Sequence, residues 1–328
     1  MVSTYNYSQR QSIANSKYIA PLLFICSLLL WGAGALFDIG TALFELPQPA
    51  GVWLAKWEIL LRPVVLAIYG AAAFLMSSYL ILERRVTWQP FIMLLFTGAC
   101  FNIQPDAVAA FTMLAFIVII GLLFRCDEAA DARRQLFTLF VGATALAILF
   151  PQFTVILLPL LIYPAMSGKL DGRSFMAALL GVATPVWLLG GLAYLFPGMM
   201  TLFDGYKEYI TGELQISKVE VTLPMLATLV AELVITVPAI AHFMLTTSIG
   251  RVRLRRRMLF CVILDILLWG AGWWCPGLFK LFLVWRMPLL SLLAAYIFPV
   301  LPQKTSNISM SAALLMWLAV AIIGLWIG

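Results

Sequence analysis

Long apolar runs alternate with short polar breaks along the whole chain. Most runs reach the roughly 17–20 residues that cross a bilayer as a helix, so the pattern predicts an all-α, polytopic transmembrane helical bundle of about 9–11 spans. Two stretches, 90–124 and 136–166, contain shorter runs and are open to a second interpretation as hairpins that dip into or tilt across the membrane. The apolar runs lie near residues 18–37, 63–82, 90–103, 107–124, 136–150, 153–166, 175–196, 224–248, 258–275, 278–298 and 310–327.

The composition agrees with a membrane protein. The chain is 63% hydrophobic and 11% charged, with a mean hydropathy of +1.00, whereas soluble domains are about 45–50% apolar and about 25% charged. Because apolar runs recur from end to end, no separate soluble domain fits between them. We therefore expect a single integral membrane domain over residues 1–328.

The chain begins with a polar segment, residues 1–17, followed by an apolar run of about one span. An alternative interpretation of this run is a signal peptide, since Ala33, Gly34 and Ala35 resemble a small-residue cleavage site. The run is longer than the roughly 7–15 residues of a signal-peptide core. This length favours a retained first span.

The distribution of positive charge predicts the orientation. If the N-terminus is inside the cell, the inside segments hold 15 of the 21 Lys and Arg residues and the outside segments hold four. Short cytoplasmic loops carry an excess of Lys and Arg, so residues 1–17 are predicted to be a cytoplasmic tail. The run RVRLRRR at 251–257 can be a nucleic-acid or lipid-headgroup patch, but its place between two spans favours a topology anchor.

Two outer loops, 38–62 and 197–223, are longer than a connection needs, and long loops are where function concentrates. In the first, Pro49 is suited to start a short helix on which Trp53 and Trp57 share one face. In the second, apolar side chains alternate with polar ones at helical spacing. Both loops are predicted to contain amphipathic helices that lie in the outer membrane interface.

Several classes of function lack their sequence signals. The five cysteines form no C-x-x-C pair and there is one histidine, His242, which disfavours a zinc site and a disulfide scaffold. The chain contains no P-loop, H-E-x-x-H or G-x-S-x-G motif, which disfavours the usual ATPases, metalloproteases and serine hydrolases. We expect no cofactor, no metal and no nucleic-acid partner.

Few ionisable residues lie inside the predicted spans, and four of them match in depth. Glu232 and Arg286 both fall about 12 Å below the outer face, and His242 and Asp265 both fall about 10 Å from the inner face, at about 1.5 Å of rise per residue. One interpretation is two charge-satisfied contacts that join neighbouring helices. The other is a proton path, or an anionic headgroup site in which Arg286 faces a phosphate.

Acidic residues on the outer side offer candidate chemistry. Asp38 follows the first span, Glu45 lies in the same loop and Asp106 marks the next outer turn. Glycosyl transfer from a lipid phosphate needs a carboxylate to deprotonate or orient the acceptor and cations to stabilise the departing phosphate. The candidate phosphate-binding cations are Lys56, Arg62 and Arg286. The alternative is that the acids end helices and that the loop tryptophans form an aromatic belt.

The order of segments in the middle of the chain resembles a known family. FNIQPDAVAAFTMLAFIVIIGLLFR, an Arg-rich break, LFVGATALAILFPQFTVILLPLLIYPAM, a basic break and SFMAALLGVATPVWLLGGLAYL follow one another between 101 and 195. This layout resembles an uncharacterised family of bacterial multi-span inner-membrane proteins and, more distantly, the GT-C superfamily of polyprenyl-phosphate-sugar glycosyltransferases. The resemblance implies the cell inner (cytoplasmic) membrane, a catalytic role for Asp38 and a turn acid at Asp106.

The chain also departs from the GT-C pattern. The paired Asp-Glu after the first span is Asp38-Ile39 here, and the His-Pro before the second span is Arg62-Pro63. The first loop is short and a large soluble domain is missing. The resemblance is therefore compatible with an inactive relative of the superfamily as well as with an active enzyme.

Three functions follow as expectations. The first is a GT-C-like membrane glycosyltransferase, or an inactive relative, that acts on a lipid-linked sugar for cell-envelope glycans, with membrane lipids and a polyprenyl-phosphate-linked sugar as partners. The second is a non-enzymatic membrane subunit or scaffold of an envelope assembly, with membrane-protein partners. The third is a transporter or lipid flippase, for which Glu232 and His242 would line a polar path across the membrane.

Overall fold

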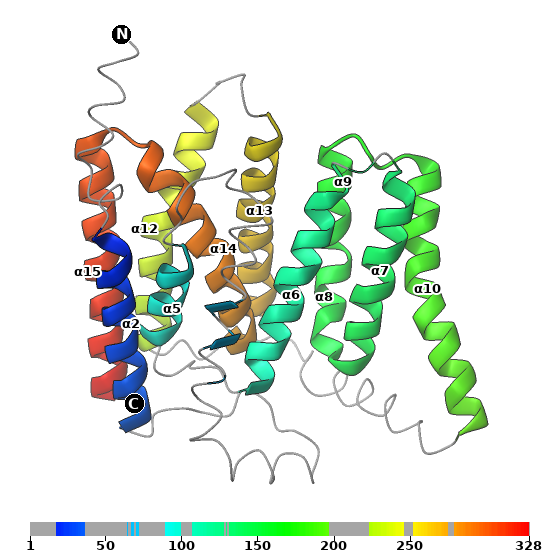
Figure 1. The fold of residues 1–328 in the computed structure, drawn as a ribbon, viewed down its shortest axis with the longest axis horizontal. Helices are drawn as coiled ribbons and strands as arrows, with labels where there is room; N and C mark the ends of the chain where they lie inside the picture. Colours follow the sequence, from blue (N-terminus) through cyan, green and yellow to red (C-terminus); the bar gives the residue numbers. More distant parts are fainter. Residues whose placement is uncertain are drawn as a thin grey trace. The chain divides into compact units, whose positions relative to one another are not determined.

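A computed structural model describes residues 18–36, 89–99, 107–127, 131–196, 223–245, 252–274 and 279–327, with single positions at 64, 67, 68, 70, 71 and 129 (Figure 1). Throughout these ranges the regular structure is helical and contains no strand. The predicted all-α class is confirmed for this part of the chain. The predicted tail 1–17 and the predicted outer-loop segments 38–62 and 197–222 lie outside the described residues, apart from residue 223, which begins a helix.

The helices follow the apolar runs closely. They are α2 Ile19–Leu36, α5 Gln89–Ala99, α6 Ala107–Arg125, α7 Ala132–Leu149, η3 Pro151–Phe153, α8 Thr154–Leu157, η4 Pro159–Leu161, α9 Ile162–Met166, α10 Gly172–Leu195, α12 Leu223–Leu245, α13 Val252–Trp274, α14 Phe279–Val300 and α15 Gln303–Ile327. Each expected run except 63–82, most of which lies outside the described residues, coincides with a helix or a chain of short helices.

Four helical segments within the described ranges are long and apolar enough to cross a membrane. They are Ala132–Leu149, Gly172–Leu195, Leu281–Phe298 and Gln303–Gly324. Segments of this length and composition identify a membrane protein. The number of passes remains a prediction.

Among the helices that begin before their apolar runs, α7 and α10 each have an aspartate cap. The Asp131 carboxylate accepts a hydrogen bond from the backbone N–H of Arg133 at 3.1 Å and starts α7. The Asp171 carboxylate accepts one from the backbone N–H of Ser174 at 2.8 Å and starts α10. Hydrogen bonds from Ser174 also lower the pKa of Asp171. These caps add one polar turn to each apolar segment.

The described part of the arginine run, residues 252–257, is helical, and its predicted role as a topology anchor remains a prediction. α13 begins at Val252, so Arg253 and Arg255 to Arg257 form its first turns. Arginine is among the better helix formers, which allows the helix to extend beyond its apolar part.

The run 153–166 is not one helix. Short α and 3-10 pieces follow one another from Pro151 to Met166. Pro151, Pro159 and Pro164 explain the interruptions, because proline removes a backbone N–H and clashes with the preceding turn.

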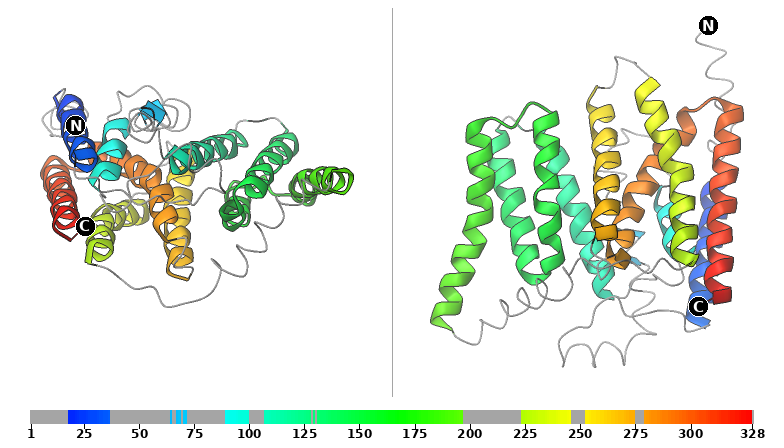
Figure 2. Two further views of the ribbon diagram at one scale, coloured as in Figure 1. Left: turned by 90° about the horizontal axis from the view of Figure 1, so that it is seen from below. Right: turned by 180° about the vertical axis from the view of Figure 1, so that it is seen from behind.

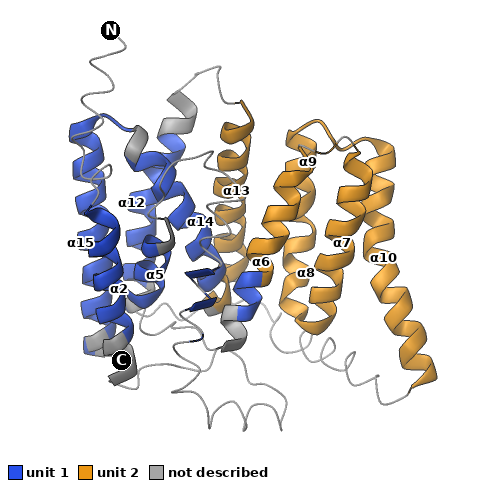
Figure 3. Cartoon of the chain, in the orientation of Figure 1, with its two compact units in different colours: residues 1–114, 220–248, 283–328 blue, residues 115–219, 249–282 orange. Residues whose placement is uncertain are grey.

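The chain divides into two compact units that alternate along the sequence (Figure 3). Unit 1 comprises Met1–Leu114, Glu220–Ser248 and Leu283–Gly328, and unit 2 comprises Ala115–Val219 and Ile249–Phe282. The single membrane domain expected from the sequence remains a prediction.

In unit 1, α2 and α5 pack in parallel. The rings of Phe24 and Phe91 lie 5.7 Å apart. Seven residues further along each helix, Trp31 lies so close to Gly98 that a Cβ there would come within 2.7 Å of the indole. The Trp31 indole N–H also donates to the Leu94 carbonyl at 3.0 Å. From the first contact to the second, the residue numbers rise in both helices. α2 and α5 therefore run in the same direction and end on the same side of unit 1.

α15 joins this pair to the rest of unit 1. α15 packs on both α12 and α5, and the rings of Phe96 and Trp317 stack at 4.4 Å between α5 and α15. The Ser306 hydroxyl donates to the Phe298 carbonyl at 2.6 Å and fastens the turn between α14 and α15.

In unit 2, α7 and α10 lie side by side (Figure 2). Gly181 permits this approach, since a Cβ there would lie 2.8 Å from both the Phe137 carbonyl oxygen and the Phe140 Cβ. Asp171 at the start of α10 interacts electrostatically with Arg133 at the start of α7. The two helices therefore begin on the same side of unit 2.

Candidate functional site

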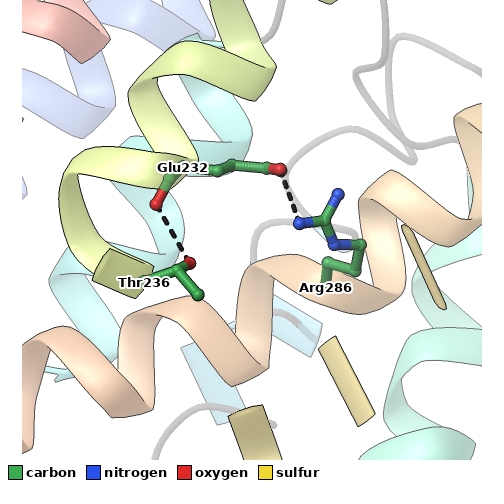
Figure 4. A network of polar contacts seen from close by, with 3 residues as sticks. All are labelled: Glu232, Thr236 and Arg286. Atoms are coloured by element: carbon green, nitrogen blue, oxygen red, sulfur yellow. Dashed lines mark hydrogen bonds and ion pairs between the residues drawn. The ribbon is translucent and has the colours of Figure 1, made fainter. Parts of the chain in front are cut away.

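A buried ion pair is the most distinctive polar feature of unit 1. The Arg286 guanidinium on α14 contacts the Glu232 carboxylate on α12 at 2.7 Å, and the two side chains are 5% and 2% exposed (Figure 4). The pairing expected from their matched depths is present. Its functional role remains a prediction.

Polar side chains continue along the same face of α12. Thr228, Glu232 and Thr236 follow at intervals of four residues and are all buried. The Thr236 hydroxyl donates to the Glu232 backbone carbonyl at 3.0 Å. On α14, the residue beside Arg286 is the fully buried Trp285, whose indole N–H donates to the Thr112 hydroxyl at 3.4 Å. The pair is thus part of a polar seam inside an apolar bundle.

Electrostatics decide what this pair can do. Burying two charges costs several kcal/mol per ion, and their mutual attraction roughly offsets that cost when the geometry is good. Removing one partner leaves a buried charge without compensation, which costs about 3–5 kcal/mol. Arg286 can therefore hold a phosphate only if the anion competes with Glu232.

Of the second expected pair, His242 and Asp265, only the Asp265 side chain is described. Asp265 lies on α13 and is 1% exposed. His242 lies on α12, but its side chain is outside the described part of the chain. The His242–Asp265 pairing stays a prediction.

The outer candidates also lie outside the described residues. They are Asp38, Glu45, Lys56, Arg62 and Asp106. Their chemistry stays a prediction. The described helices nearest in sequence are α2, which ends two residues before Asp38, and α6, which begins directly after Asp106.

Unit 2 contains a second charged cluster, which the sequence did not reveal. The Tyr163 hydroxyl on α9 donates a hydrogen bond to the Asp127 carboxylate after α6. The Arg257 guanidinium on α13 donates to the Phe124 carbonyl at 3.2 Å, and it lies beside the same tyrosine hydroxyl. We call Asp127, Tyr163 and Arg257 the polar latch, because they join three helices.

Aromatic rings surround the latch. The Tyr163 ring meets Phe124 and Phe260 edge to face at 4.9 and 5.3 Å. Arg257 lies over the Phe124 ring at 5.6 Å, within reach of a cation–π interaction. In the sequence, Tyr163 is one of two side chains with a hydroxyl in the apolar run 153–166, and Arg257 is one of several arginines. Their pairing depends on tertiary contacts that no local spacing reveals.

Cys126 lies beside the latch and is buried. Burial raises the pKa of its thiol to about 11, and the neighbouring Asp127 charge acts in the same direction. The thiolate is the nucleophilic form of cysteine, so this residue is a poor nucleophile near neutral pH. Within the described residues no group of three or more His, Cys, Asp or Glu could hold a metal ion.

The helix ends around the latch collect positive charge. Arg257 links the start of α13 to the end of α6, and Tyr163 links α9 to the turn after α6. Asp171 links the starts of α7 and α10. We call this side of unit 2 the basic end. Its described basic residues are Arg125, Arg133, Arg134, Lys169, Arg173, Arg253, Arg255, Arg256 and Arg257.

Comparison with known proteins gives no neighbour: no family model, curated protein or solved structure matches the chain.

Proposed function

We propose that the protein is a GT-C-like glycosyltransferase, or an inactive relative of one, that spans the cytoplasmic membrane and acts on a lipid-linked sugar for envelope glycans. Its N-terminus is cytoplasmic and its two long loops face outward. The proposal rests on the order of segments in the sequence and on one feature of unit 1, the parallel packing of α2 and α5.

The parallel packing supports the proposal through connectivity. Helices that run in parallel end on the same side, and Asp38 follows the end of α2 by two residues. Asp106 follows the end of α5 by seven residues and directly precedes α6. Both acids therefore belong to chain segments that begin on one side of unit 1, as a shared outer site requires. An antiparallel pair would have sent these segments to opposite sides.

The reaction assigns a role to each candidate. Asp38 accepts the proton of the acceptor hydroxyl as its oxygen attacks the anomeric carbon, while the bond from that carbon to the lipid phosphate breaks. Asp106 and Glu45 orient the acceptor or the first acid. Lys56 and Arg62 stabilise the negative charge that develops on the departing polyprenyl phosphate. Arg286 assists only where a phosphate takes the place of Glu232.

Substitutions that remove charge but keep shape test the transferase. Asp38→Asn and Asp106→Asn should abolish the envelope glycan in a complemented deletion strain, while expression and thermal stability stay as in wild type. Asp131→Asn is a matched control, because asparagine caps a helix about as well as aspartate. If both Asn variants support wild-type glycans and growth, the transferase proposal is wrong.

A non-enzymatic membrane subunit is the second candidate, and the Glu232–Arg286 pair favours it. A guanidinium already held at 2.7 Å by a carboxylate serves to join α12 and α14 rather than to bind a phosphate. For a subunit, charge-removing substitutions of the outer acids should leave the glycans unchanged. Loss of the ion pair should instead reduce the amount of assembled complex in the membrane.

A further inference from the structure

We propose that the basic end of unit 2 is a binding surface for anionic phospholipid headgroups. The surface lies apart in sequence from the candidate transferase residues, and the proposal does not depend on that function. It follows from charge, from the rigid support that the latch gives and from the apolar side chains beside it.

The charge of the basic end is strongly unbalanced. Its described residues include nine basic side chains and three acidic ones, Asp127, Asp131 and Asp171, which gives a net charge of +6. The basic side chains come from the end of α6 and the starts of α7, α10 and α13, with the turn before α10. Segments separated by more than a hundred residues thus contribute to one positive surface, which no single run in the sequence shows.

The guanidinium group suits a phosphate ligand. Eight of the nine basic residues are arginines and one is a lysine. Arginine presents a planar fork that binds phosphate oxygens in pairs, whereas lysine acts as a point charge. Arg125, Arg133, Arg134 and Arg173 are exposed, as are Arg253 and Arg255 at the start of α13.

The polar latch fixes two of the helix ends that carry these arginines, the end of α6 and the start of α13. Arg257 is held by the Phe124 carbonyl and ring, and Tyr163 is fully buried against Asp127. The first turns of α13 are therefore anchored to α6 and α9. An anchored surface loses less conformational entropy on binding than a free tail of the same charge.

Exposed apolar side chains beside the arginines favour a membrane over a soluble acidic partner. Phe137 on α7 is 38% exposed and lies one turn after Arg134. Phe175 and Met176 on α10 are 40% and 56% exposed and follow Arg173 within one turn. Apolar groups at this spacing reach the acyl chains while the guanidinium groups stay at headgroup depth.

The test uses the full-length protein reconstituted in phosphatidylcholine vesicles. Spin-labelled phosphatidylglycerol and spin-labelled phosphatidylcholine, each added in trace amounts, report the relative association of anionic and zwitterionic lipid with the protein by electron paramagnetic resonance. Three variants are compared: wild type, Arg133→Gln/Arg134→Gln/Arg173→Gln, and the charge-conserving Arg133→Lys/Arg134→Lys/Arg173→Lys. Circular dichroism and labelling of an introduced outer cysteine verify fold and orientation for each.

Wild type should prefer the anionic lipid, and the glutamine variant should lose about tenfold of that preference, since each basic residue near an anionic surface contributes measurably to binding. The lysine variant should keep most of the preference for anionic lipid. Salt at about 0.5 M should weaken this preference wherever it is present, because it screens the charges. Equal association of both lipids with wild type would overturn the proposal and leave an acidic soluble partner as the ligand. An unchanged preference in the glutamine variant would overturn it as well, because the anionic lipid would then bind elsewhere.

Discussion

The Glu232–Arg286 pair in unit 1 and the polar latch in unit 2 each combine an acid with an arginine, but in different surroundings. Both members of the pair are at most 5% exposed, whereas Asp127 and Arg257 of the latch are half-buried. Glu232 meets Arg286 directly, whereas Arg257 contacts a carbonyl, an aromatic ring and a hydroxyl.

This difference follows from access to water. Deep in an apolar bundle, a charge needs an opposite charge, because few other groups can offset its desolvation. At a helix end, carbonyls, rings and solvent share that role. We therefore expect unit 1 to depend on one strong coupling and unit 2 on several weaker contacts.

The largest effect should come from breaking the ion pair on one side. Glu232→Leu removes the carboxylate that the buried Arg286 guanidinium contacts and should lower the free energy of unfolding by about 3–5 kcal/mol. The double variant Glu232→Leu/Arg286→Leu should recover most of the loss, because both charges are gone. Thermal unfolding in detergent measures both, and Thr236→Val on the same face is the control. If the losses from Glu232→Leu and from Arg286→Leu simply add up in the double variant, the two residues do not interact.

A smaller effect is expected at the latch. Tyr163→Phe removes the hydroxyl that donates to Asp127, and a hydrogen bond to a charged group contributes about 1.5–3 kcal/mol to stability. The loss should fall at the lower end of that range, because Asp127 is half-buried and can turn to water. Tyr194→Phe is the matched control, since Tyr194 is 85% exposed. A loss at Tyr163 as large as that at Glu232 would erase the contrast between the units.

The reactivity of Cys126 reports on the burial of the latch. Because the pKa of its thiol is raised to about 11, almost all of it is protonated at pH 8, and alkylation by a maleimide should be slow. The rate should rise with pH toward 11 as the thiolate forms, and Arg257→Gln should accelerate it by loosening α13. Mass spectrometry of the labelled peptide measures the rate. Rapid labelling at pH 8 in the folded wild type would contradict the burial of Cys126 beside the latch.

The smallest effect is expected from the exposed arginines of the basic end. Arg133→Gln and Arg173→Gln should each change the free energy of unfolding by less than about 0.5 kcal/mol, as for most surface substitutions. A large loss at either position would mean that these arginines support the fold, as Arg257 does. The measurement is the same thermal unfolding in detergent.

The two regions also differ in what the sequence predicted. Apolar runs located most helix ends to within a few residues but placed the starts of α13 and α15 six and seven residues late. An isolated acid and an isolated arginine at equal depth identified the ion pair. The starts of α7 and α10 were placed late, because a capping aspartate outside the apolar run sets them. The latch was missed because Asp127, Tyr163 and Arg257 lie far apart in the chain and only tertiary packing brings them together. The apolar pattern predicted one run at 153–166, but Pro151 before this run and Pro159 and Pro164 within it divide it into short helical pieces.

The most direct test of the account asks whether the C-terminal ends of α2 and α5 bring Asp38 and Asp106 together. In a variant without native cysteines, Asp38→Cys/Asp106→Cys is treated in membranes with a short bifunctional thiol cross-linker. Phe24→Cys/Phe91→Cys is the positive control, because those rings lie 5.7 Å apart between the same two helices. The account predicts an intramolecular product for both pairs, seen as a shift in gel migration that a protease site engineered between the cysteines confirms. A product for the 24–91 pair with none for the 38–106 pair would contradict the shared site.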